Sequence, residues 1–254
     1  MTIKHTALSL FCSALLLGAG ASAALAAPIK NIVLVHGAFV DGAGWEGVYH
    51  RLTKDGYHVT LVQEPLTSFS DDVAAAKRVL AEQDGPTVLV GHSYGGAIIT
   101  EAGNDPHVAA LVYIAAHALD SGETEAANGK KLPNTAHPFV KTQDGYLYID
   151  RKNFPADFAA DLPLATARFE ADSQILTSAS VFTANIPDPA WKVKPSWYMV
   201  AQADKIISPD LERMYAKRAH STTVEVKGAS HSVYQSHPRE VAALIESAAQ
   251  NALR

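Results

Sequence analysis

The sequence predicts an α/β fold with about six strands in a mostly parallel sheet, helices on both faces, and a cap inserted between the fourth and fifth strands. Three observations support this class. Apolar strand-like runs alternate with helical patterns along the chain, which is typical of parallel sheets. One run leads directly into a Gly-x-Ser-x-Gly turn and a helix start rich in small residues. The alternation stops over residues 117–194, a stretch too long for an ordinary connection.

The six predicted strands are short runs rich in apolar and β-branched residues. They cover residues 31–35, 58–62, 88–90, 109–116, 196–201 and 223–227. A first helix is expected after the first strand, because Trp45, Val48 and Leu52 recur at helical spacing. A second helix is expected to begin near Ser70, and Pro238 marks the start of the closing helix.

The insertion at residues 117–194 is rich in proline and glycine and holds short helical patterns at 156–162 and 164–173. It follows the fourth strand, so it should lie over the sheet edge at which ligands bind in open α/β folds. We therefore expect a lid over a substrate pocket. The predicted substrate contacts are Phe182 and Trp191 in this insertion and Phe39 after the first strand.

The first 26 residues predict a cleavable signal peptide. Lys4 and His5 precede an apolar core too short to span a bilayer, and small residues suited to cleavage end at Ala26. An uncleaved membrane anchor is the alternative, which the short core disfavours. Cleavage would leave residues 27–254 as a single domain in a periplasm or the medium. It would also remove Cys12, the one cysteine, leaving no disulfide, thiol nucleophile or thiolate metal site.

The charge balance argues against a nucleic-acid partner. Lys and Arg number 21 against 26 Asp and Glu, a formal net charge of −5, and no basic cluster interrupts the chain. Nearly half of the residues are hydrophobic, which is enough for the core of one domain of this length. We expect a small-molecule partner and no membrane association of the mature form.

Ser93 is the predicted catalytic nucleophile. It stands at the centre of Gly91-His92-Ser93-Tyr94-Gly95, between a predicted strand and a predicted helix. The two glycines leave the backbone room for a tight reversal that would present the Ser93 hydroxyl above the sheet. The bare pattern would occur by chance in about one chain in ten of this length. The prediction therefore depends on the strand before it and the helix after it.

An acid and a base follow in the order that such a turn requires. Asp204 lies in the loop after the fifth predicted strand, and His231 follows the sixth. Both should therefore reach the sheet edge expected for Ser93. Asp210 is the competing acid, but its neighbour Pro209 indicates a helix start, where a carboxylate is favoured by the helix dipole.

The loop at residues 36–39 predicts an oxyanion hole. It follows the first strand and can aim the backbone N–H of Ala38 at the same point as that of Tyr94. Two converging donors stabilise the negative charge that develops in acyl transfer, often the largest single catalytic contribution. We expect His36 and His92 to shape their turns rather than to transfer protons.

The chain resembles the α/β-hydrolase superfamily, and more closely its small branch of plant methylesterases and hydroxynitrile lyases. The resemblance covers residues 31–64, 87–118 and 195–247 and rests on the segments LVHGA (34–38), VGHSYGG (90–96), DKIISP (204–209) and KGASH (227–231). It implies a version of the fold without the two antiparallel strands that open larger members. It also implies the roles given above for Ser93, Asp204, His231, Ala38 and Tyr94.

Two positions separate the esterases of this branch from its lyases. The lyases carry Thr after the oxyanion-loop His and Lys after the catalytic His, where this chain has Gly37 and Ser232. The resemblance thus favours a serine hydrolase that cleaves small to medium, largely apolar carboxylic esters, with no metal and no organic cofactor. The alternatives are a hydroxynitrile lyase-like or perhydrolase-like enzyme, or a ligand-sensing protein with slow turnover.

Overall fold

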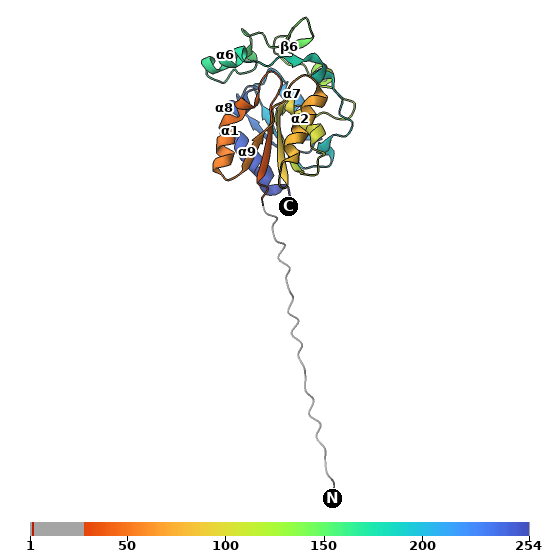
Figure 1. The fold of residues 1–254 in the computed structure, drawn as a ribbon. Coiled ribbons are helices and arrows are strands. Elements are labelled where there is room, and N and C mark those ends of the chain that lie inside the picture. Colours follow the sequence, from red (N-terminus) through yellow and green to blue (C-terminus); the bar gives the residue numbers. More distant parts are fainter. Residues whose placement is uncertain (1, 3–27, 254) are drawn as a thin grey trace.

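The computed structural model describes residue 2 and residues 28–253 of the chain. Its centre is a six-stranded sheet in the order β2-β1-β3-β4-β8-β9, and every neighbouring pair is parallel (Figure 1). The strands are β1 (Asn31–Val35), β2 (His58–Leu61), β3 (Thr87–Ser93), β4 (Val108–Ala116), β8 (Ser196–Ala201) and β9 (Thr222–Val226). The predicted α/β fold with six parallel strands is confirmed. The predicted signal peptide, residues 1–26, lies outside the described residues except for Thr2.

Helices cover both faces of this sheet. On one face lie α1 (Glu46–Lys54) and α9 (Pro238–Asn251), and on the other lie α2 (Phe69–Ala81), α3 (Gly95–Ala102) and α7 (Pro209–Arg218). The β1 side chains alternate accordingly, with Val33 and Val35 in one hydrophobic core and Ile32 and Leu34 in the other. The four inner strands β1, β3, β4 and β8 are thus buried on both sides, which explains why they are continuous apolar runs, whereas the edge strands β2 and β9 are more exposed.

The second helix begins slightly before its predicted start. Ser68 is the N-cap of α2, and its hydroxyl accepts a hydrogen bond of 3.2 Å from the backbone N–H of Asp71. This bond satisfies one of the amides that a helix leaves unpaired at its first turn. Ser70, the predicted start, therefore lies inside the first turn.

The segment between β4 and β8 forms the cap, which lies above the carboxyl ends of the strands (Figure 1). Its helices are α4 (Glu125–Lys131), α5 (Phe154–Asp157) and α6 (Leu164–Asp172), with the short 3-10 helices η2 (Ala179–Thr183) and η3 (Ala190–Lys192). It also holds an antiparallel sheet of β5 (Val140–Lys141), β6 (Tyr146–Tyr148) and β7 (Thr177–Ser178), which the sequence did not predict. The predicted helical piece at 164–173 matches α6, whereas most of 156–162 is not helical.

The cap is joined to the loops of the main sheet by hydrogen bonds. The Phe39 amide donates to the Thr177 hydroxyl at 3.1 Å, and the Ile175 amide donates to the Phe39 carbonyl at 3.1 Å. The Ser178 amide donates to the Leu66 carbonyl at 2.9 Å. Strand β7 thus lies beside the loop that follows β1, and the cap is less independent than a freely moving lid.

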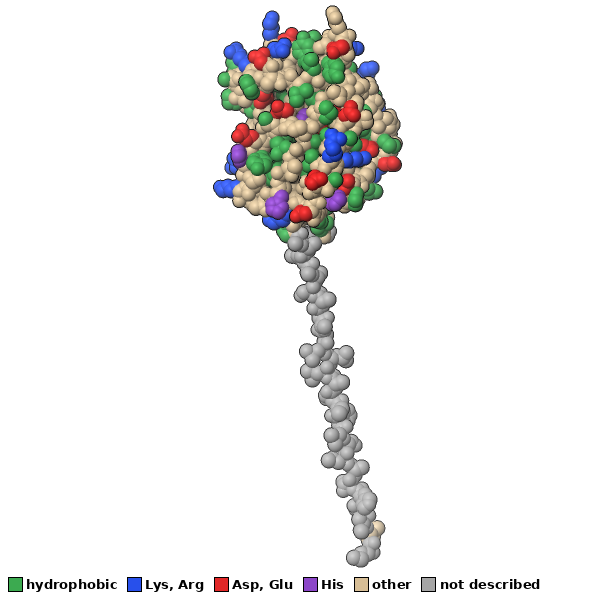
Figure 2. Space-filling view, in the orientation of Figure 1, with side chains coloured by type: hydrophobic (Ala, Val, Ile, Leu, Met, Phe, Trp, Pro, Cys, Tyr) green, Lys and Arg blue, Asp and Glu red, His purple; other side chains and the backbone are tan. Residues whose placement is uncertain are grey.

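The surface carries both signs of charge. On the face in Figure 2, Lys and Arg side chains are interspersed with Asp and Glu over the cap and the main domain. Across residues 28–253, no helix combines the length and the hydropathy needed to span a membrane.

Candidate active site

Ser93 lies at the turn between β3 and α3. Its φ of 55° is in the left-handed region, which a residue with a side chain rarely adopts and which is often found at functional sites. The turn is tight because a Cβ added at Gly91 would lie 2.5 Å from the Gly95 carbonyl oxygen. One added at Gly95 would collide with the backbone of His36. Both glycines of the motif are therefore required by close backbone contacts.

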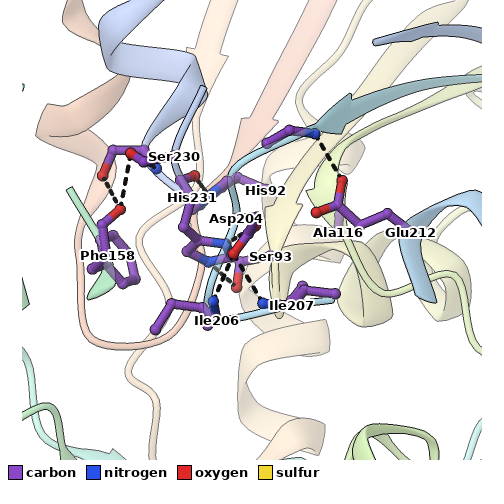
Figure 3. Close-up of polar contacts among 12 residues, drawn as sticks. His92, Ser93, Ala116, Phe158, Asp204, Ile206, Ile207, Glu212, Ser230 and His231 are labelled. Atoms are coloured by element: carbon purple, nitrogen blue, oxygen red, sulfur yellow. Dashed lines mark hydrogen bonds and ion pairs between the residues drawn. The ribbon is translucent and has the colours of Figure 1, made fainter. Parts of the chain in front are cut away.

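The side chains of Ser93, His231 and Asp204 form one hydrogen-bonded chain (Figure 3). Ser93 Oγ lies 2.9 Å from His231 Nε2, and His231 Nδ1 lies 2.6 Å from Asp204 Oδ2. The exposed fractions are 6% for Ser93, 5% for Asp204 and 0% for His231, so solvent does not compete for these bonds. The carboxylate beside Nδ1 fixes the imidazole tautomer that leaves Nε2 free to accept a proton from Ser93.

Backbone amides fix the orientation of the Asp204 carboxylate. Its Oδ1 accepts hydrogen bonds from the amides of Ile206 at 2.7 Å and Ile207 at 2.9 Å, which leaves Oδ2 for the imidazole. Asp210, the competing acid, lies instead in the first turn of α7 and pairs with Arg213 at 2.9 Å. The structure thus brings Asp204 and not Asp210 to His231.

The loop that contains Ala38 lies directly against Ser93. A Cβ added at Gly37 would lie 2.7 Å from Ser93 Cβ, and Ala38 lines the cavity that Ser93 faces. Tyr94 follows Ser93 as the N-cap of α3, and its phenol donates a 2.7 Å hydrogen bond to Asp72. The phenol is thus bound to α2, and the oxyanion role of the Tyr94 backbone N–H stays a prediction.

His92 and His36 make the structural contacts expected of them. His92 Nε2 lies 2.9 Å from the His231 carbonyl oxygen, to which it donates when neutral. Burial holds the pKa of His92 well below its usual value, so this imidazole stays neutral. His36 Nδ1 lies 2.9 Å from the Gly37 carbonyl oxygen, and its Nε2 forms an ion pair with Glu64.

A cavity of about 420 Å³ opens above Ser93 between the sheet and the cap. Its wall is largely apolar and includes Phe39, Phe139, Phe158 and Phe182. Two of the three predicted substrate contacts, Phe39 and Phe182, therefore line it. Phe182 lies 6.0 Å from Phe39 between ring centroids, in a stacked arrangement.

Trp191, the third predicted substrate contact, does not line this cavity. Its indole N–H donates a 2.8 Å hydrogen bond to the Leu119 carbonyl, and the Arg218 guanidinium lies 5.3 Å from its ring. An indole N–H needs an acceptor when it is buried. The bond to Leu119 satisfies that need and holds the ring away from the site.

Three buried acidic or imidazole side chains near the site were not predicted. His117 and Glu125 line the cavity, and Glu212 lies behind Asp204, where its Oε2 accepts a 3.0 Å hydrogen bond from the Ala201 amide. Burial raises the pKa of Glu212, and the charge of Asp204 raises it further. His117 directly follows β4 at the edge that holds Ser93, so its position was a usable signal. Glu125 and Glu212 lie in helical segments without such a signal.

The cap also contacts the segment that contains His231. The Ser232 amide and hydroxyl donate to the Phe158 carbonyl at 3.0 Å and 3.1 Å. The Ser230 amide donates to Asp161 Oδ2 at 3.2 Å, and the Ser230 hydroxyl donates to Asp161 Oδ1. The cap therefore helps to hold His231 in place.

Comparison with known proteins assigns the chain to a family. The model of the alpha/beta hydrolase family matches residues 32–244. The chain is 26% identical to Esterase PIR7B of Oryza sativa subsp. japonica, over 84% of this chain and 92% of that protein. It is 27% identical to a pyrethroid hydrolase of Sphingobium wenxiniae, over 85% and 86% respectively. The fold matches the crystal structure of polyneuridine aldehyde esterase with a TM-score of 0.73 and 18% identity, over 86% of this chain and 98% of that one. The protein therefore belongs to the alpha/beta hydrolase family.

Proposed function

We propose that this protein hydrolyses carboxylic esters through a covalent acyl-enzyme on Ser93. The observation that supports this best is the chain of hydrogen bonds from Asp204 through His231 to Ser93, which ends at the largely apolar cavity. A serine hydroxyl needs such a base to become nucleophilic at neutral pH. The esterase relatives support the same chemistry.

The geometry supports a two-step reaction. His231 Nε2 takes the Ser93 proton as Oγ attacks the ester carbonyl carbon, and Asp204 stabilises the resulting imidazolium. The backbone N–H groups of Ala38 and Tyr94 would bind the oxyanion of the tetrahedral intermediate. The C–O bond to the alcohol then breaks, and His231 returns the proton to the departing oxygen. Water attacks the acyl-enzyme by the same route and releases the carboxylic acid and free Ser93.

The apolar cavity favours small to medium uncharged esters over polyanionic ones. Ser232 occupies the position at which the lyases of the resembled branch carry a lysine, and its hydroxyl is already hydrogen-bonded to the cap. A neutral hydroxyl there offers no positive charge for cyanide. We further propose that the signal peptide directs the protein to a periplasm or the medium, with residues 27–254 acting as one domain.

The deciding experiment is labelling with a fluorophosphonate probe, followed by steady-state assays on a panel of p-nitrophenyl esters. We expect one probe adduct on the wild type by intact mass and none on Ser93→Ala, with kcat lowered by about four to six decades in the variant. Equal labelling of both proteins would contradict the assignment of Ser93. A burst of one equivalent without further turnover would favour a ligand-sensing protein. Faster conversion of cyanohydrins, or of peroxide plus acetate, would favour a lyase or a perhydrolase.

A further inference from the structure

His117 and Glu125 form a buried polar pair in the largely apolar wall of the cavity. Of the cavity-lining residues that are at least nine-tenths buried, only Ser93, His117 and Glu125 are polar. His117 follows β4, whereas Glu125 is the first residue of the cap helix α4 and is 6% exposed. The pair therefore connects the main sheet and the cap within reach of a molecule bound at Ser93.

A chain of hydrogen bonds leads to His117 and favours one position for its proton. Arg218 pairs with Glu123 at 2.8 Å, and the Asn128 amide nitrogen donates both to Glu123 at 2.9 Å and to the Tyr215 hydroxyl at 3.1 Å. The Tyr215 oxygen accepts from Asn128 and lies 3.3 Å from His117 Nδ1. In the tautomer in which the Tyr215 O–H donates to Nδ1, the neutral His117 carries its proton on Nε2.

The two oxygens of Glu125 differ in their surroundings. Its Oε2 lies 3.3 Å from His117 Nε2, whereas its buried Oε1 has no hydrogen-bond partner among the described residues. Burial raises the pKa of Glu125 well above its usual value, which favours the protonated carboxyl group. A buried carboxyl O–H without an acceptor is costly. Because Oε1 has almost no accessible surface, a ligand in the cavity that Glu125 lines would remove this cost once a rotation of the carboxyl group turns the O–H toward it.

We propose that Glu125, positioned by His117, donates a hydrogen bond to a second, uncharged carbonyl oxygen of the substrate, so that the preferred substrates are esters that also carry a ketone group. This inference rests on the proposed ester hydrolysis and specifies its substrate class. The remaining wall is mostly hydrocarbon and aromatic, which suits the rest of such a molecule. A site built around a hydrogen bond disfavours an analogue that lacks the matching group, because the site's polar atom is then left unpaired.

The test compares kcat/KM for matched esters with and without a ketone. One pair is p-nitrophenyl hexanoate and the same ester with a ketone in its acyl chain. The other pair is phenyl acetate and acetylphenyl acetate, which carries its ketone in an acetyl group on the ring. Dividing each enzymatic ratio by the ratio for hydroxide hydrolysis removes the intrinsic reactivity of the esters. In at least one pair we expect the wild type to prefer the ketone ester by about tenfold, the value of one net hydrogen bond.

Two substitutions separate the hydrogen-bonding role of Glu125 from a purely structural role. Glu125→Leu should reduce the ketone preference by about tenfold, whereas Glu125→Gln should keep it within about threefold, because an amide N–H replaces the carboxyl O–H. Glu125→Met serves the same purpose if Glu125→Leu does not fold. Glu170→Leu is the matched control, since Glu170 is a partly buried carboxyl of α6 that does not line the cavity. Its preference should equal that of the wild type.

The outcomes distinguish this inference from the proposed function. Absence of ester turnover and of probe labelling in the wild type would contradict ester hydrolysis itself. Ester turnover with no ketone preference in either pair would overturn only the role of Glu125. A preference that persists unchanged in Glu125→Leu would also overturn it.

Discussion

The ring of Phe158 lies edge-on to the imidazole of His231, with ring centroids 4.7 Å apart and planes at 76°. Phe158 belongs to the cap, and its carbonyl accepts the hydrogen bonds from Ser232 described above. The proposed general base is therefore packed between the main sheet and the cap. A change in the cap that displaces Phe158 should consequently affect the chemistry as well as substrate access.

Asp161→Ala tests this coupling between the cap and the base. The substitution removes both hydrogen bonds to Ser230, so we expect a loss of about 1–2 kcal/mol of stability and a decrease in kcat of about tenfold with little change in KM. Urea denaturation and steady-state kinetics on an acetate ester measure the two effects. Asp172→Ala removes an exposed cap carboxylate that pairs with Arg151 and is the control. Equal effects of both substitutions would contradict a specific role for Asp161.

Asp204→Asn and Asp210→Asn separate the two candidate acids. Asp204→Asn should lower kcat by about four decades near neutral pH, because an amide beside Nδ1 favours the wrong imidazole tautomer. Asp210→Asn should keep its rate and change the free energy of unfolding by about 1 kcal/mol at most, through the first turn of α7. The assignment of the acid fails if the rates of the two variants are reversed.

Phe182→Ala should widen the cavity and extend the range of accepted acyl chains. The ratio of kcat/KM for octanoate over acetate esters should rise, while acetate turnover stays within about tenfold, since one remote contact provides about 1–3 kcal/mol of discrimination. Trp191→Ala is the control, because its ring packs outside the cavity. That variant should lose stability by about 1–3 kcal/mol and keep the wild-type chain-length preference. Loss of acetate hydrolysis in a folded, probe-reactive Phe182→Ala would mean that the cap carries a catalytic group.

Glu212→Gln should weaken the pH dependence of stability. The pKa of Glu212 is raised in the folded protein by burial and by Asp204. The folded state therefore binds a proton that the unfolded state releases, and stability is lost as pH rises through the folded pKa. Glutamine cannot ionise, so the urea midpoint of the variant should fall less than that of the wild type from about pH 5 to about pH 8. Identical slopes for the two proteins would show that Glu212 titrates normally.

The site residues that the sequence located share one property, a position at the end of a strand. Ser93 ends a strand-like run, and Asp204 and His231 each follow one, with the flanking turns visible in the sequence. Parallel strands end at one edge of a sheet, so residues distant in sequence converge there. The fold and the meeting of Ser93, His231 and Asp204 at one sheet edge were predictable for this reason.

The cap was less predictable because its contacts are set by tertiary packing. The strands β5 and β7 have two residues each, too few for a periodic pattern to appear. Trp191 and Phe182 are both aromatic residues of the cap, but Trp191 lies outside the cavity and bonds to the Leu119 carbonyl, a distant acceptor that the sequence does not reveal. Glu125 follows the capping residue Thr124, a position at which acids usually meet solvent, so nothing local indicated its burial.

The hydrogen bonds between Phe39 and the cap residues Ile175 and Thr177 limit how this fold can be recombined. The backbone of Phe39, next to the proposed oxyanion donor Ala38, uses both its amide and its carbonyl to bind cap residues. A cap taken from another family member would bring different partners for these two groups. In chimeric enzymes, the segment around residues 36–40 and the cap should therefore be inherited from the same parent, as a single exchangeable unit.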